Sequence, residues 1–113
     1  MNYRIVSQKN ISVITINGDI SKDDRDAISQ CLKELQDLNA DSIILYFRNV
    51  NSIEVPVHRE LALLQHEIRQ KRTLKIVGLN SQLRSYLGEK GIIRGHEVGT
   101  SLNDVLAAMT KVG

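Results

Sequence analysis

The chain has 113 residues, of which 42% are hydrophobic and 25% are charged, and its formal net charge is +2. This length supports one hydrophobic core, so residues 1–113 are predicted to form a single domain. The small net charge and the scattered basic residues argue against a nucleic-acid partner. No apolar run is long enough for membrane insertion, and residues 1–5 lack a signal-peptide pattern, so a cytoplasmic location is expected.

The first third of the chain predicts a hairpin followed by a helix. Tyr3–Ser7 and Ile11–Asn17 alternate apolar and polar residues, which indicates two antiparallel strands. Residues 21–24 have the pattern of a capping box with carboxylates in the first helical turn. The helix that follows has an apolar stripe formed by Ile28, Cys31, Leu32, Leu35 and Leu38. Cys31 is the only cysteine, and its place on this stripe predicts a packed thiol.

The middle of the chain predicts a buried strand and a second helix. Ser42–Phe47 is nearly continuous in apolar residues, which favours a central strand with neighbours on both sides. Pro56 suits the first helical position, because its missing N–H would be unpaired there. The apolar residues Val57, Leu61, Leu64 and Ile68 then keep helical spacing, so we expect a helix that ends near residue 72.

The last third predicts a strand over Leu74–Leu79 and a short helix that is capped at residues 80–81 and closes at Gly88 or Gly91. A short strand is expected near His96–Val98. Residues 101–104 open a final helix whose inward side chains are Leu102, Val105, Leu106, Met109 and Val112. The alternation of strands and helices after a hairpin predicts an α/β fold, with a mixed sheet of about four to five strands and helices mainly on one face.

The sequence lacks the usual patterns of catalytic and metal sites. It has no Walker-type loop, and Gly78 alone before a helix is a poor phosphate cradle. The three histidines lack a second histidine at the spacing that places two metal ligands on one helical face. His58 and His66 are therefore predicted to be exposed helix residues. We expect no enzymatic activity, no metal and no cofactor.

The loop and helix start over residues 51–61 form the candidate site. Glu54 lies just before the helix, which favours either N-terminal capping or presentation to a protein partner. Val55 and Val57 are expected to be exposed and to form a modest apolar patch that needs cover. The predicted partner-binding residues are Asn51, Ser52, Glu54, Val55, Pro56, Val57, His58 and Leu61.

Two segments carry patterns that are similar to those of one family. Residues Phe47–His58 occupy a strand-end pattern close to Leu-Ser-x-Val-x-x-Ile-Asp-Ser-Ser-Gly-Leu, in which Val50 and Ile53 match and Glu54 stands for the aspartate. Residues 75–79 and 101–106, with the helix between them, are similar to the later strand and the final helix of the same family. The chain thus resembles the STAS family of anti-sigma factor antagonists and sulfate-transporter tails, over nearly its whole length.

The resemblance implies a bacterial protein-interaction module that acts in signalling or transcription regulation. It implies as partner either an anti-sigma factor, which is a serine-kinase-like ATPase, or the ATPase subunit of a lipid-transport system. Phosphorylation-regulated members carry a serine where this chain has Pro56, which lacks a hydroxyl, and Ser52 is the alternative acceptor. A small-ligand-binding sensor domain and a weak homodimer stay open as alternatives.

Overall fold

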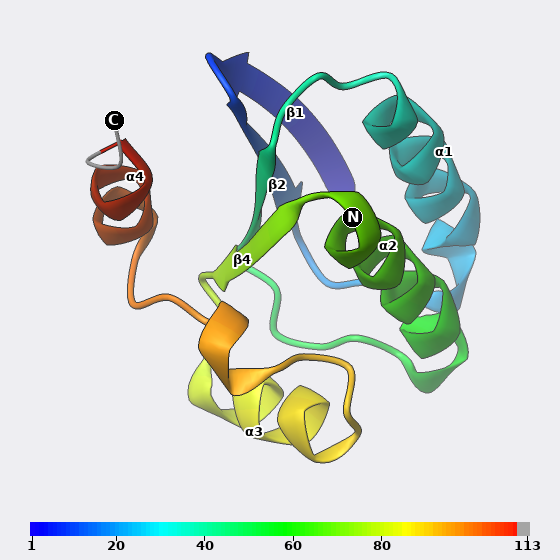
Figure 1. Ribbon diagram of the computed structural model, residues 1–113. Coiled ribbons are helices and arrows are strands. Elements are labelled where there is room, and N and C mark those ends of the chain that lie inside the picture. Colours follow the sequence, from blue (N-terminus) through cyan, green and yellow to red (C-terminus); the bar gives the residue numbers. More distant parts are fainter. Residues whose placement is uncertain (111–113) are drawn as a thin grey trace.

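The computed structural model describes residues 1–110, which form a mixed four-stranded sheet in the order β1-β2-β3-β4 (Figure 1). The strands are β1 (Asn2–Gln8), β2 (Ile11–Asn17), β3 (Ser42–Arg48) and β4 (Thr73–Val77). Strands β1 and β2 pair antiparallel, whereas β2 with β3 and β3 with β4 pair parallel. The predicted hairpin and the predicted central strand are therefore confirmed.

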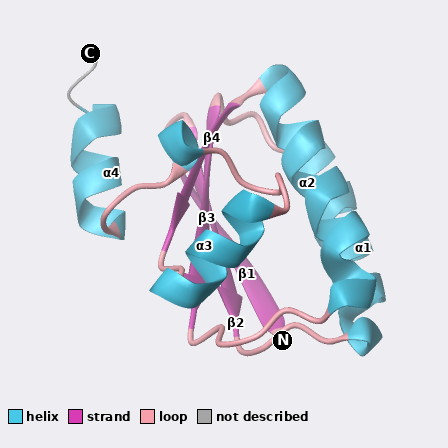
Figure 2. Ribbon diagram, turned by 90° about the horizontal axis from the view of Figure 1, so that it is seen from below, coloured by secondary structure: helices cyan, strands magenta, loops and turns pink. Residues whose placement is uncertain are grey.

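The helices cover the two faces of the sheet unequally (Figure 2). Helices α1 (Arg25–Gln36), α2 (His58–Lys71) and α3 (Ser81–Glu89) contribute side chains to the main core, whereas α4 (Leu102–Thr110) lies on the opposite face. The main core includes Leu45, Phe47 and Leu61, and a smaller cluster joins Ile44 and Val77 to Val105 of α4. This arrangement agrees with the predicted mixed sheet with helices mainly on one face.

Short polar signals set the ends of the helices. The Ser21 hydroxyl accepts the Asp23 N–H, and the Asp24 carboxylate accepts the Ser21 N–H at 2.7 Å, which forms the predicted capping box ahead of α1. The Asn80 side chain accepts the Leu83 N–H at 2.8 Å and caps α3. Gly91 follows α3 with φ +73°, so it, and not Gly88, closes this helix in the left-handed conformation.

Gly78 fixes the turn after β4 in a way that a larger residue could not. Its φ is +88°, and a Cβ at this position would collide with the Phe47 carbonyl oxygen and the Tyr46 ring. The backbone of this turn therefore packs directly against the end of β3, and any side chain would force the two segments apart. This contact positions the start of α3 beside the carboxyl end of the sheet.

The last third of the chain differs from the sequence predictions at one expected strand. The strand expected over His96–Val98 is wrong: residues Gly95–Glu97 form a 3₁₀ turn, and Val98 makes only an isolated parallel bridge with Ile76. Hydrogen bonds from the Glu97 N–H to the Arg94 carbonyl and from the Val98 N–H to the Gly95 carbonyl close this turn, so its backbone cannot extend into a strand. Of the predicted inward side chains of the last helix, Val105 is buried and Leu102, Leu106 and Met109 pack against its cluster, while Val112 lies outside the described residues.

Cys31 is buried with 1% of its surface exposed, and burial raises the pKa of its thiol to about 12. The prediction of a packed thiol is confirmed. In residues 1–110 we find no helix with both the length and the apolar character needed to cross a membrane.

Candidate protein-binding surface

The loop between β3 and α2 is held by the loop that follows β2. The Asp19 carboxylate accepts the backbone N–H groups of Asn51 at 2.6 Å and of Ser52 at 3.2 Å. Next to this contact, Ile20 and Ile53 form a parallel bridge, with the Ile20 N–H donating to the Ser52 carbonyl at 3.0 Å. The hydrogen bond from the Asn51 N–H is the main reason why the pKa of Asp19 is lowered. Although exposed, this loop therefore has a fixed backbone path.

A 3₁₀ turn over Val55–Val57 leads from this loop into α2. Glu54 occupies the N-cap position, but its side chain makes no capping hydrogen bond, so the capping hypothesis for this carboxylate is wrong. Arg25 at the start of α1 takes part in fixing the turn instead. Its guanidinium donates to the Pro56 carbonyl at 2.9 Å and lies 3.5 Å from the Glu60 carboxylate.

The two valines of the turn have opposite environments. Val55 is 67% exposed, whereas Val57 is completely buried in the main core. The expectation that both valines are exposed is therefore wrong for Val57, and Leu61 one turn later is also fully buried. Neither Val57 nor Leu61 can contact a partner directly. Among the other predicted binding residues, Asn51, Ser52, Glu54 and Pro56 are exposed and His58 is half-buried.

His58 connects the start of α2 to α3. Its Nε2 lies 3.1 Å from the Ile53 carbonyl oxygen, and its ring packs edge to face on Tyr86 with 5.4 Å between the centroids. The Lys90 ammonium lies 5.7 Å from the centroid of the same tyrosine ring. His58 is thus less exposed than predicted and has a positioning role, while His66 is exposed as predicted and bonds Gln70.

We define the α2-start surface as the exposed and half-exposed residues that these contacts hold in place. Its members are Asn51, Ser52, Glu54, Val55, Pro56 and His58. Sequence reasoning did not find Asp19, Arg25 and Tyr86, which fix this surface from segments distant in the chain. In residues 1–110 no group of three or more metal-binding side chains comes together.

A separate groove of about 810 Å³ lies between α4 and the amino ends of the parallel strands. Its walls combine apolar side chains of α4, such as Val105 and Met109, with Lys9, Lys75 and Asp41. The opposite charges on these walls do not select one class of ligand. The groove lies away from the α2-start surface, to which it contributes no residue.

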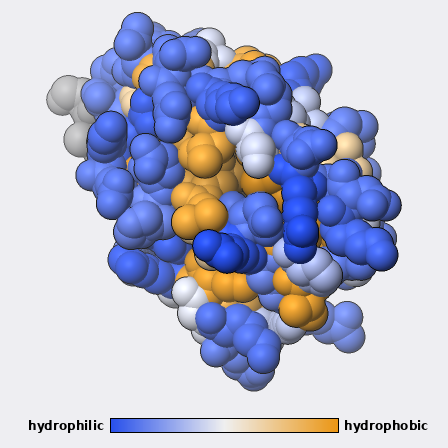
Figure 3. All heavy atoms as spheres, turned by 90° about the vertical axis from the view of Figure 1, so that its right-hand side faces the viewer, coloured by the Kyte–Doolittle hydropathy of each residue, from blue (hydrophilic) through white to orange (hydrophobic). Residues whose placement is uncertain are grey.

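The hydrophobic side chains left on the surface are few. Val6, Val55 and Leu63 are the exposed large hydrophobic residues of the described chain. Figure 3 views the side that carries α1 and α2 in Figure 1, and it shows hydrophobic side chains in a hollow between polar ones. Leu63, which is 51% exposed, belongs to α2. The helix that begins at the α2-start surface therefore also carries a second exposed apolar side chain.

Comparisons with known proteins give a result for the fold alone. No family model and no curated protein matches the sequence. The structure is similar to unphosphorylated SpoIIAA, an anti-sigma factor antagonist, with a TM-score of 0.75, 10% identity and 98% of each chain covered. It is also similar to an anti-sigma factor antagonist from Mycobacterium paratuberculosis, with a TM-score of 0.78, 15% identity, and 95% of this chain and 92% of the other covered.

A sulfate transporter family protein from Wolinella succinogenes is similar too, with a TM-score of 0.77 and 20% identity over 94% of this chain and 89% of the other. The fold of this chain is therefore the STAS-domain fold, as its sequence patterns predicted. At these identities the likeness extends to the fold and not to the residues of the α2-start surface.

Proposed function

We propose that this STAS-fold chain is a non-enzymatic interaction module that binds a regulatory protein through the α2-start surface, without phosphorylation at position 56. The observation that carries the proposal is the 67% exposure of Val55 on a backbone that Asp19, Arg25 and His58 hold in place. An exposed apolar side chain with a polar rim has the composition of a transient interface. A fixed backbone lowers the entropy that binding would cost.

The same geometry argues against a phosphorylation switch at this surface. Pro56 has no hydroxyl, so the switch position of phosphorylation-regulated relatives is chemically blocked. Ser52 has a hydroxyl, but its N–H already binds the Asp19 carboxylate, which would repel a phosphate dianion placed beside it. We propose that binding is constitutive or is controlled elsewhere.

The structural neighbours support a proposal for the class of partner. Two of the similar structures are described as anti-sigma factor antagonists, so we propose an anti-sigma factor, a serine-kinase-like ATPase, as the first partner and a role in bacterial cytoplasmic signalling. The ATPase subunit of a lipid-transport system is the second candidate. A small-ligand sensor is the competing function, which the open groove beside α4 favours.

The test measures binding of the purified chain to each candidate ATPase of the source genome by isothermal titration calorimetry. We expect Val55→Asp to weaken binding by at least about tenfold, the size expected for a central apolar contact. Leu63→Asp is the matched control, because Leu63 is also exposed, at 51%, and belongs to α2 outside the α2-start surface. Equal affinities for both variants would move the interface away from the α2-start surface.

The absence of phosphorylation is tested separately on the same purified complex. Incubation of the complex with ATP and magnesium, followed by intact-mass spectrometry, should leave the mass of the chain unchanged. A gain of one phosphate that Ser52→Ala abolishes would contradict the proposal and identify Ser52 as a displaced acceptor. Absence of binding to every candidate, with a ligand-dependent thermal shift, would favour the sensor function.

A further inference from the structure

The sheet ends in two edges, and the edge at β4 is closed. Val98 bridges Ile76, and the Gly99 N–H donates to the Ile76 carbonyl at 2.8 Å. The Lys75 ammonium donates to the His96 carbonyl at 2.9 Å and holds the same segment against the strand. The edge is thus covered by the chain itself at Ile76, so a further strand cannot be added along the whole of β4 without displacing the segment.

The edge at β1 is open. Within residues 1–110, strand β1 is hydrogen-bonded to β2 alone and stands at the end of the sheet order (Figure 1). Its seven residues pair with β2 in one unbroken register, from Asn2 with Asn17 to Gln8 with Ile11. The strand therefore has no bulge, and it contains no proline. A bulge and a proline are common ways of blocking an edge strand, and without them β1 is a regular template for pairing.

We propose that the β1 edge binds a second copy of this chain, with the two β1 strands antiparallel and centred on Ile5. This register pairs all seven residues of β1 with those of the second copy. Asn2 then faces Gln8, Tyr3 faces Ser7, Arg4 faces Val6, and Ile5 faces itself. The symmetric contact uses the β1 edge of each copy and covers both, so assembly stops at a dimer with a continuous sheet.

The side chains of β1 suit this self-pairing. Arg4 is the only charged residue of the strand, and the register places it opposite Val6 rather than opposite its own copy. Val6 is 52% exposed and pairs with Val13, which packs against the α4 cluster, so Val6 lies on the α4 face of the sheet. The aliphatic stem of Arg4 would cover Val6 of the second copy. On the other face Ile5 packs against the main core and would meet its own copy.

The pairing of Arg4 with Val6 gives a test that depends on register. Sedimentation velocity over a concentration series would compare the unmodified chain with Val6→Glu and Val6→Lys, which change the same half-exposed position to opposite charges. Two cross-strand pairs change at once, so the dissociation constants of these variants should differ by about tenfold or more. Val6→Glu should give the tighter dimer, because its carboxylate would face Arg4, and the difference should shrink in high salt.

Three results would overturn the proposal. The first is a monomer at every concentration up to about 1 mM, which is the weak end of the affinity scale. The second is a dimer whose dissociation constant is the same for Val6→Glu and Val6→Lys, which would place the contact elsewhere. The third is a series of larger species. None of these results bears on partner binding, because the α2-start surface shares no residue with β1.

Discussion

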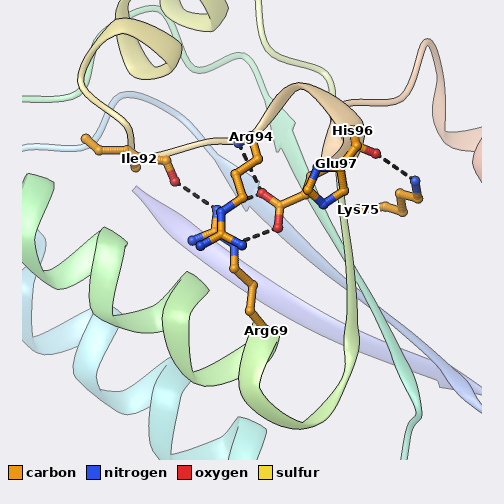
Figure 4. A network of polar contacts seen from close by, with 6 residues as sticks. All are labelled: Arg69, Lys75, Ile92, Arg94, His96 and Glu97. Carbon is orange, nitrogen blue, oxygen red and sulfur yellow. Dashed lines mark hydrogen bonds and ion pairs between the residues drawn. The ribbon is translucent and has the colours of Figure 1, made fainter.

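The two ends of α2 are fixed by different kinds of contact. At the end of α2, the Arg69 guanidinium and the Glu97 carboxylate form a bidentate ion pair in which both N–O distances are 2.6 Å (Figure 4). Arg69 also donates to the Ile92 carbonyl at 3.0 Å. The side chains of this pair are 15% and 4% exposed. At its start, the polar contacts are single and partly solvated, and Val55 projects outward. The buried ion pair at the end of α2 thus stabilises the fold, whereas the start of α2 exposes side chains to solvent.

The largest expected effect is the difference in stability between substitutions of the two valines at the start of α2. Val57→Asp places a carboxylate in a fully buried position and should lower the free energy of unfolding by about 3 kcal/mol or more. Val55→Asp changes an exposed side chain and should stay within about 0.5 kcal/mol of the unmodified chain. Urea denaturation followed by circular dichroism measures both. Similar losses for the two variants would contradict the opposite environments of the valines.

The second effect concerns the end of α2. Glu97→Ala leaves the Arg69 guanidinium buried without its partner and should cost about 3 kcal/mol. The matched control replaces both partners, as Arg69→Met with Glu97→Leu, and should lose much less stability because no charge remains unpaired. Chemical denaturation at neutral pH compares the two. A double variant as unstable as the single one would show that loss of the ion pair itself, and not the unpaired guanidinium, causes the destabilisation.

The same ion pair predicts a pH dependence. Burial raises the pKa of Glu97, but hydrogen bonds from Arg69 and from the Arg94 N–H outweigh it, so the pKa is lowered overall. A lowered carboxyl pKa contributes stability that is fully present above the ordinary glutamate value of about 4.3 and is lost as the pH falls through the folded-state pKa. The stability gap between the unmodified chain and Glu97→Gln should therefore narrow on acidification. A stability gap that widens on acidification would mean that the pKa of Glu97 is raised and not lowered.

A smaller effect is expected at Arg72, the residue that follows α2. Its guanidinium donates to the Ala40, Leu35 and Leu38 carbonyls at 2.9, 3.2 and 2.7 Å and so ties α2 to the end of α1. Arg72→Ala should cost about 2 kcal/mol, whereas Arg72→Lys keeps the charge without the fork and should recover only part of it. Thermal unfolding monitored by circular dichroism tests the ranking, which full recovery by lysine would contradict.

The smallest expected effect on stability concerns the cap of α3, the helix that contacts the start of α2. The Asn80 side chain caps α3, which carries the Tyr86 ring that His58 contacts. Asn80→Ala should cost about 1 kcal/mol, and Asn80→Asp should restore most of it because a carboxylate also accepts the Leu83 N–H. Urea denaturation of both variants measures this difference. Equal losses would mean that the cap contributes no hydrogen bond to stability.

Sequence patterns predicted the parts of this structure that depend on neighbours in the chain. The hairpin, the Ser21 capping box and the Asn80 cap each arise from residues a few positions apart. The burial of Val57 agrees with its helical spacing to Leu61 and Leu64, and the expectation that it is exposed was wrong because it set this spacing aside. Residues that fix the surface were missed because they contact it from distant parts of the chain: Arg25 meets Pro56 across 31 positions, and Asp19 meets Asn51 across 32.

The central claim is that a partner covers the start of α2 and not its end. Hydrogen–deuterium exchange with mass spectrometry, on the chain alone and in complex with the ATPase identified by calorimetry, tests this claim directly. We predict that the complex slows exchange in peptides that span residues 51–58 and leaves those that span residues 92–98 unchanged. Protection confined to residues 92–98, or absent from residues 51–58, would contradict the account.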